Sequence, residues 1–225
     1  MTDGLVLHLD AANVRSYPGS GTTWTDLSGL GNNGTLTNGP TFNANNAGSI
    51  VFDGTNDYTT LGTPTRLNQI QVPLTICAWV NLNSSSGLRT IWGVYSRADS
   101  HEIYSLLRVN NGTLHYYASN VSGGYQSQAS FTVNTGVWCF IAAVVSGSIS
   151  SPTVTNYLNT QKQTFSYSAF SSTPIATVDF RIGGNQAQLN EGWNGNIAQV
   201  FWYNKALNDS EIRQNFNATR GRFGI

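Results

Sequence analysis

The chain has 225 residues, of which only 10% are charged, with 11 Lys and Arg against 11 Asp and Glu. A formal net charge of zero offers no basic field for a phosphate backbone, which excludes nucleic acid as an expected partner. Asn, Ser, Thr and Gly together make up about two residues in five, and these residues disfavour helical backbone. A helical bundle is therefore excluded, and an all-β protein is expected.

The sequence shows no targeting or membrane signal. Residues 1–4 hold no basic segment, so no cleaved signal peptide is expected. The longest apolar run, residues 137–145, is much shorter than the roughly 18 residues that a spanning helix needs, so no membrane insertion is expected. Cys77 and Cys139 lie in apolar stretches, where a buried free thiol is favoured over a disulfide.

Period-two alternation of apolar and polar residues is the dominant pattern along the chain. It predicts strands at several places, including residues 74–80, 103–109 and 178–182. Residues 137–145 and 197–203 are apolar at nearly every position, as expected for strands that are covered on both faces in a sandwich of two sheets. The pattern indicates an all-β, antiparallel two-sheet sandwich.

Turn signals rich in Gly and Asn separate these runs. Residues 109–114 predict a hairpin, because Asn111 and Gly112 tolerate the positive φ values of a tight turn. No fixed-period repeat, heptad or low-complexity linker divides the chain. Residues 1–225 are therefore expected to form a single domain.

One short helix is expected near the C-terminus. Asn208 is a suitable N-cap, and Glu211 stands at the position of its capping-box partner. Ile212 and Phe216 share one face of this helix, and Gly221 can end it in the left-handed conformation. The helix is expected to act as a structural lid over the end of the sandwich.

The motifs of known catalytic sites are missing. Glycosidases need two carboxyl groups that flank the scissile bond, which a strand of the pattern E-x-D-x-E or E-x-D-x-x-E can supply. The three glutamates of the chain do not begin such a pattern: Glu102, Glu191 and Glu211. The histidines are scattered, and each is expected to be structural: His8, His101 and His115. The sequence therefore predicts that the protein is not an enzyme.

Residues 52–58 concentrate oxygen ligands around a Gly turn. Asp53, Asn56 and Asp57 supply two carboxylates and an amide, which suit Ca²⁺. The alternative is that these side chains close a turn by hydrogen bonds to the backbone, and this alternative is favoured.

Aromatic residues gather in the middle of the chain. Such rings can stack on sugars, while an arginine among them can bond to hydroxyl groups. The candidates for carbohydrate contact are Trp92, Tyr95, Arg97, Tyr104, Tyr116, Tyr125 and Trp193. For each ring the alternative is a place in the core, because a sandwich needs large inward side chains.

Several strings resemble the laminin-G-like, concanavalin-A-like jelly-roll superfamily. They are residues 24–29 (WTDLSG), 31–36 (GNNGTL), 49–58 (SIVFDGTNDY), 74–80 (LTICAWV) and 193–207 (WNGNIAQVFWYNKAL). The resemblance covers nearly the whole chain and implies a jelly roll. The C-terminal residues 215–218 and 222–225 resemble, more narrowly, the versions carried by structural proteins of tailed bacteriophages.

The resemblance leaves three functions open, because this fold hosts sugar binders, adhesion modules and glycan-cleaving enzymes. The first is a non-enzymatic virion protein, displayed on the capsid or tail, that decorates and stabilises the particle or adheres to host-surface glycans. The alternatives are a free carbohydrate-binding lectin and, disfavoured by the missing carboxylate pair, a glycan-cleaving hydrolase. The expected partners are other virion proteins and host glycans, with many copies or a homo-oligomer assembled in the host cytoplasm onto the virion surface.

Overall fold

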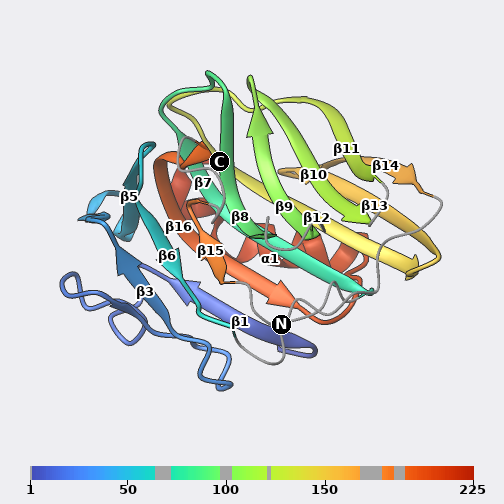
Figure 1. Ribbon diagram of the computed structural model, residues 1–225. Coiled ribbons are helices and arrows are strands. Elements are labelled where there is room, and N and C mark those ends of the chain that lie inside the picture. The colour runs from blue at the N-terminus through green and yellow to red at the C-terminus, as the bar shows by residue number, and fades with distance from the viewer. Residues whose placement is uncertain (1, 64–71, 97–102, 121–122, 168–178, 185–190) are drawn as a thin grey trace.

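The computed structural model describes residues 2–63, 72–96, 103–120, 123–167, 179–184 and 191–225. Within them two antiparallel sheets of eight strands face each other (Figure 1). This arrangement confirms the predicted two-sheet sandwich. None of the described helices is long and apolar enough to cross a membrane.

Sheet A is built around strand β16. Its strand order is β14-β13-β12-β7-β16-β5-β4, and β1 also pairs with β16. The strands are β1 Leu5–Asp10, β4 Thr41–Asn43, β5 Ser49–Asp53, β7 Leu74–Leu82, β12 Trp138–Ser148, β13 Ser151–Leu158, β14 Gln161–Ser166 and β16 Asn194–Tyr203. On one side β16 pairs first with β5 and then with β1, so one strand joins three distant parts of the chain.

Sheet B has the strand order β11-β10-β9-β8-β15-β6-β3-β2. The strands are β2 Thr23–Trp24, β3 Gly34–Thr37, β6 Tyr58–Thr60, β8 Leu88–Ser96, β9 Ile103–Asn110, β10 Thr113–Asn120, β11 Gly123–Thr132 and β15 Phe180–Ile182. The predicted hairpin is confirmed, because β9 and β10 are joined at Asn111 and Gly112, whose φ values are 45° and 83°.

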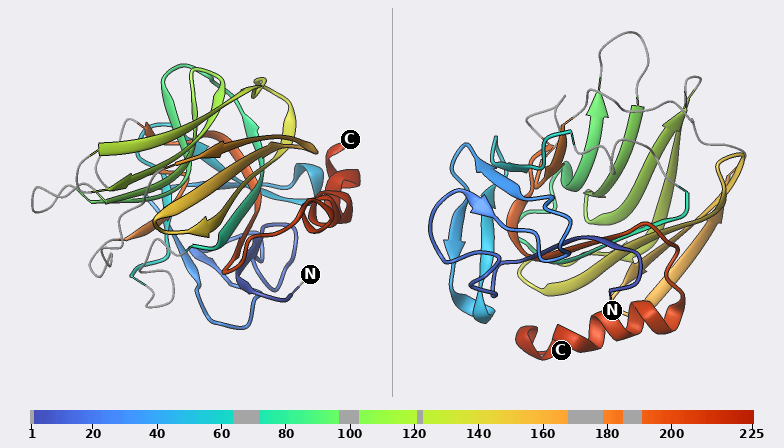
Figure 2. Two further views of the ribbon diagram at one scale, coloured as in Figure 1. Left: turned by 90° about the vertical axis from the view of Figure 1, so that its right-hand side faces the viewer. Right: turned by 90° about the horizontal axis from the view of Figure 1, so that it is seen from below.

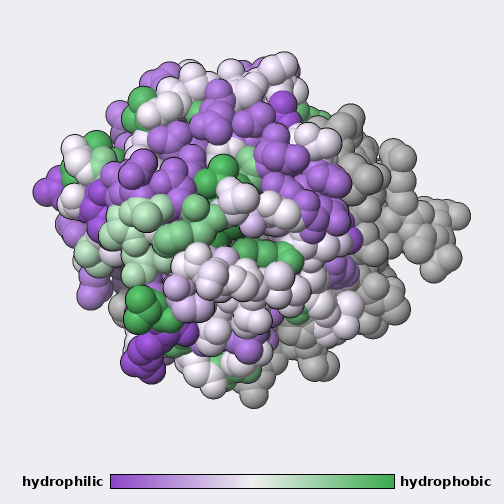
Figure 3. Space-filling view, turned by 90° about the vertical axis from the view of Figure 1, so that its left-hand side faces the viewer, coloured by the Kyte–Doolittle hydropathy of each residue, from purple (hydrophilic) through white to green (hydrophobic). Residues whose placement is uncertain are grey.

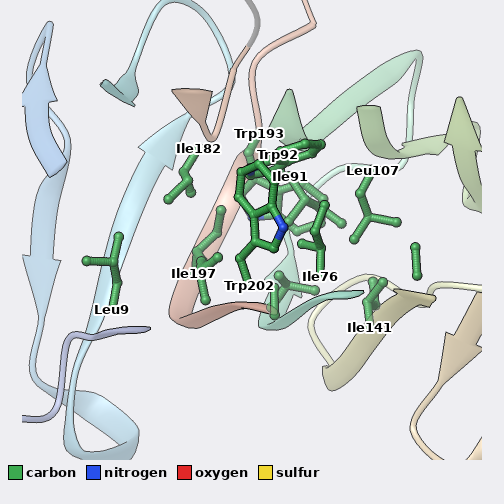
Figure 4. Packing of buried hydrophobic residues seen from close by; sticks show 14 of the residues in the cluster. Leu9, Ile76, Ile91, Trp92, Leu107, Ile141, Ile182, Trp193, Ile197 and Trp202 are labelled. Atoms are coloured by element: carbon green, nitrogen blue, oxygen red, sulfur yellow. The ribbon is translucent and has the colours of Figure 1, made fainter. Parts of the chain in front are cut away.

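The main core lies between the two sheets (Figure 4). Trp92 of β8 meets Trp202 of β16 edge to face, with ring centroids 4.9 Å apart. Leu107 from sheet B and Ile141 from sheet A are completely buried in the same cluster. Edge-to-face pairs of this kind stabilise by about 1 kcal/mol beyond the area that they bury.

A second core covers the outer face of sheet A. All nine residues of β7 are buried, because both faces of the sheet are covered, although alternation was predicted there. The predicted burial on both faces is confirmed for residues 139–145 and 197–203, and it is wrong for Val137, which is 51% exposed. The helix α1, Asp209–Thr219, packs outside the sheets (Figure 2) and is continued by the 3₁₀ turn η4, Arg220–Phe223. Trp79 of β7 stacks on Phe216 and Phe223, with centroid distances of 5.5 and 4.3 Å.

The start of helix α1 is as predicted, and its end is not. The Asn208 side chain accepts hydrogen bonds from the backbone of Ser210 and Glu211, and Glu211 completes the capping box. The prediction for Gly221 is wrong: this residue lies inside η4, and Gly224 takes the left-handed conformation with φ 73°. The extra turn brings Phe223 onto Trp79, so α1 and η4 cover the outer face of sheet A rather than the end of the sandwich.

The two cysteines confirm the predicted free thiols. Cys77 and Cys139 are both buried and unbonded to each other. Burial raises the pKa of the Cys139 thiol to about 12, so it stays protonated at neutral pH.

Asp26 organises the loop that joins the N-terminal strands. Its carboxylate accepts hydrogen bonds from the backbone N–H groups of His8, Ser28 and Asn32, at 2.9, 2.9 and 3.0 Å. The Ser28 hydroxyl donates a fourth bond at 2.7 Å. This one side chain therefore ties the loop to strand β1.

Replacing this carboxylate should destabilise the protein. Because Asp26→Ala leaves several partly buried N–H groups without an acceptor, we expect the free energy of unfolding to fall by about 3 kcal/mol. Asp3→Ala is the matched control: the Asp3 side chain is 84% exposed, and the change should stay within about 0.5 kcal/mol. Urea unfolding of both variants measures the difference, and equal losses would contradict the role given to Asp26.

Candidate functional site

The outer face of sheet B carries a polar centre. Residues that pair directly across antiparallel strands point to the same face. Leu107 and Val109 lie in the core, so Arg108 between them points outward. The register then places two outward rows across the sheet: Thr90, Arg108 and His115 in one, and Thr60, Arg181, Gly93, Leu106 and Tyr117 in the other.

Arg108 is the middle of a first group of three side chains, the Arg108 triad, formed with Glu191 and Tyr117. Its Nη1 lies 3.8 Å from the Glu191 carboxylate, and the Arg108 and Glu191 side chains are only 12% and 6% exposed. Its guanidinium carbon lies over the Tyr117 ring, 5.0 Å from the centroid. A carboxylate and an aromatic ring thus hold the arginine in place.

Arg181 forms the same arrangement on the other side of β8, here named the Arg181 triad. Its Nε donates to the Asp179 carboxylate at 2.9 Å, and its guanidinium carbon lies 3.8 Å from the centroid of the Tyr58 ring. The Thr60 hydroxyl bonds to the second Asp179 oxygen. Both triads therefore place a carboxylate, a guanidinium and a phenol on one sheet face.

Gly93 lies between the triads. It pairs with Arg181 on one side and with Leu106, two residues from Arg108, on the other. Because it has no side chain, strand β8 adds no bulk at this point, and Leu106 is the side chain that lies between Gly93 and Tyr117 in the row. Each arginine covers one face of its tyrosine ring, so polar contacts here would come from N–H and O–H groups rather than from stacking on that face.

Hydrogen bonds to Arg89 of β8 and to Gly183 fix the segment that carries Glu191. Arg89 Nη1 donates to the carbonyl oxygens of Gly54 and Gly192, at 3.2 Å each. The Trp193 N–H donates to the Gly183 carbonyl at 2.8 Å. These bonds set the carboxylate beside Arg108 although the two residues are far apart in sequence.

His115 lies beside Arg108 on the neighbouring strand and is only 2% exposed. Burial, and then the positive charge of Arg108, lower the pKa of His115 from 6.5 to about 4. The imidazole is therefore neutral at neutral pH. In this form one ring nitrogen donates a hydrogen bond and the other accepts one.

Three of the predicted sugar-contact rings are core residues. Trp92, Tyr116 and Trp193 are 1%, 1% and 0% exposed, so they offer no face on which a sugar could stack. The Tyr116 hydroxyl bonds to Ser105 at 2.8 Å, and burial raises its pKa to about 12. For these three rings the structure favours the alternative role in packing.

The other predicted contact residues lie wholly or partly outside the described part of the structure. Tyr95, Tyr104 and Tyr125 belong to strands β8, β9 and β11, and their side chains are not described. Arg97 lies outside the described residues altogether.

The turn after β5 uses its carboxylates for backbone hydrogen bonds. Asp53 Oδ1 accepts from the N–H groups of Thr55 and Asn56, at 2.7 and 3.3 Å. Asp57 Oδ2 accepts from the Asp53 N–H at 3.0 Å, and burial raises the Asp57 pKa. The described residues hold no group of three or more His, Cys, Asp or Glu that could bind a metal, whereas Ca²⁺ takes six to eight oxygen ligands.

Sequence reasoning missed both triads, although one signal was available. The predicted hairpin at Asn111 and Gly112 fixes the register, which sets His115 opposite Arg108. Tyr117 then follows on the same face as His115, two residues later. No sequence pattern brings Glu191 or Asp179 to these arginines, because both acidic residues come from other parts of the chain.

The described apolar side chains at the surface do not gather into a second candidate site. Figure 3 shows the end of the molecule over the N-terminal strands, where hydrophilic and neutral areas surround small hydrophobic ones. The largest exposed apolar side chains of the described residues are scattered, at Val14, Leu30, Val137 and Ile225. Single apolar residues at a surface are ordinary and define no site.

The sequence profile of the concanavalin A-like lectin/glucanases superfamily matches residues 53–213, more than two thirds of the chain. No curated protein sequence gives a significant match.

Solved structures agree with this fold. Domain 4 of AbnA, a GH43 extracellular arabinanase from Geobacillus stearothermophilus solved in complex with arabinotriose, has a TM-score of 0.71 at 19% identity, over 93% of this chain and 97% of that one. The binding domain of Paraclostridial Mosquitocidal Protein 1 has a TM-score of 0.71 at 18% identity over 96% of this chain. This chain spans about half of that binding domain, 52%.

A sialidase is also similar in part. Trypanosoma rangeli sialidase in complex with sialic acid has a TM-score of 0.66 at 16% identity, over 97% of this chain and 33% of the sialidase. At such identities the likeness concerns the fold alone.

Protonation of His115 should destabilise the fold in mild acid. Its pKa is 6.5 in the unfolded chain and about 4 in the folded one, so between these values only the unfolded chain binds the proton. The free energy of unfolding should therefore fall as the pH is lowered from 6.5 to 4. His115→Asn should show a shallower fall in urea unfolding across this range, and identical slopes would contradict the prediction.

Calcium binding at the turn of Asp53, Asn56 and Asp57 stays a prediction. Binding to the folded state alone would raise the free energy of unfolding by about 2.7 kcal/mol at a hundredfold excess over Kd. Melting curves in millimolar CaCl₂ and in EDTA measure this. Identical curves would assign the three side chains to turn formation only.

Proposed function

The chain belongs to the concanavalin A-like lectin/glucanases superfamily, and we propose that it binds carbohydrate through the outer face of sheet B. The observation that carries the proposal is the pair of triads around Arg108 and Arg181 on that face. On the outer face of sheet A, α1 and η4 pack over the apolar side chains of β7, β12 and β16, whereas no described helix packs on the outer face of sheet B.

The chemistry of the triads suits sugar hydroxyl groups. A hydroxyl both donates and accepts a hydrogen bond. Each triad offers guanidinium N–H donors, carboxylate acceptors and a phenol that can do either, held by ion pairs and ring contacts. Groups held in place before binding lose little conformational entropy when the ligand arrives.

Structural neighbours support the same function by analogy. A domain of similar fold and nearly the same length was solved in complex with arabinotriose. Another neighbour is the binding domain of a mosquitocidal protein. These likenesses support carbohydrate binding better than the virion role expected from the C-terminal residues, which none of these comparisons supports.

We also propose that the protein binds its glycan without cleaving it. Within the described residues, the carboxylates of the two triads, Glu191 and Asp179, are each paired with an arginine. They do not belong to one strand pattern that would supply a general acid and a nucleophile. A bound oligosaccharide should therefore be recovered intact after prolonged incubation, as chromatography of the products would show.

Substituting the arginines should weaken glycan binding. Arg108→Lys and Arg181→Lys keep the charge beside Glu191 and Asp179 but lose the planar guanidinium, so we expect each to raise the Kd at least tenfold. A glycan array identifies the ligand, and titration calorimetry gives the Kd. The matched control is Arg213→Lys, on the exposed side of α1, which should leave the Kd unchanged.

Melting temperatures of the three variants separate loss of binding from loss of folding. If the array gives no glycan ligand, or if Arg213→Lys weakens binding as much as the triad variants do, the proposed function is refuted.

A further inference from the structure

We infer that the outer face of sheet B selects neutral sugars and discriminates against anionic ones. The inference rests on the proposed function and names the class of glycan that the triads would take.

The charges of the two arginines are already compensated. Arg108 is paired with Glu191, and Arg181 with Asp179, at 3.8 and 2.9 Å. All four side chains are at most 20% exposed, so solvent screens them only in part. A sugar carboxylate that approached either guanidinium would therefore meet the carboxylate already bound to it, and like charges at such distances repel.

The histidine of the two outward rows adds no charge at neutral pH. His115 stands beside Arg108, and its lowered pKa keeps it uncharged at neutral pH. Among the described residues, the two outward rows thus hold two cations, which face two anions. An uncharged ligand enters this field without a net electrostatic penalty.

Two polar atoms on the Arg108 row still lack a partner. Thr90 Oγ and Arg108 Nε are buried, and neither makes a hydrogen bond within the described structure. Thr90 pairs directly with Arg108, so both belong to one row of the outer face. Buried polar groups without partners are costly. A small buried water satisfies such groups, because it accepts from Arg108 Nε and donates to Thr90 Oγ, and a neutral sugar hydroxyl can bond to that water in turn.

The test compares neutral and acidic glycans of matched structure. An array carries neutral oligosaccharides beside counterparts of the same linkage oxidised to the carboxylate at C6, and lactose beside sialyllactose. We expect the neutral member of a bound pair to bind at least tenfold more tightly in calorimetry. A carboxylated member that binds as tightly or more tightly would overturn the inference while leaving carbohydrate binding intact.

A charge-removing variant tests the cause. Glu191→Gln frees Arg108 from its compensating charge, so the Kd for the carboxylated glycan should fall at least fivefold relative to that for its neutral partner. Asp3→Asn is the matched control, because it removes the same charge beside Lys205, on the side of helix α1, and should leave the ratio unchanged.

If Glu191→Gln does not fold, Asp179→Asn makes the same test at the Arg181 triad. An unchanged ratio in the folded variant would overturn the inference. Binding to neither class of glycan would refute the proposed function and this inference together.

Discussion

Sheet A must be covered on both faces, and this requirement determines where the rest of the molecule can act. Strand β7 is buried along its whole length, so sheet B lies against one face and α1 with η4 against the other. Trp79 shows the second cover most directly, because it stacks on both Phe216 and Phe223. Sheet B has no such helix among the described residues, and its outer face carries ionised side chains instead of an apolar surface.

Stability alone does not account for two buried ion pairs on one sheet face. Removing charges from water costs free energy that the attraction within a pair barely offsets. A protein with apolar residues of similar size in place of a buried ion pair is therefore often as stable or more stable. In sheet A such residues do fill the corresponding positions beneath the helix. Arg108 with Glu191 and Arg181 with Asp179 on sheet B therefore agree with the proposed role in recognition, for which a fixed polar group is needed.

Local patterns gave much of the fold, and the site depends on contacts that are not local. Asn208 and Glu211 predict the start of α1, because a capping box involves only neighbouring residues. The end of the helix differs, because Phe223 is drawn onto Trp79 by tertiary packing. Burial of Trp92 and Trp193 was an open alternative, since a ring in a strand looks the same in sequence whether it faces a core or a ligand. The acidic partners of the arginines reach them only through the folded topology.

The separation of core and polar face also explains how such distant sequences share this fold. Chains with 18% and 19% identity to this one reach TM-scores of 0.71, because the sandwich requires apolar residues at the right period rather than particular ones. Outward residues such as Arg108 and Tyr117 make no part of that pattern, so they can differ between relatives without changing the fold. The proposed specificity therefore depends on the two triads and not on the shared fold, and the neighbouring strands β6, β15, β8, β9 and β10 of sheet B hold the triads at a fixed spacing.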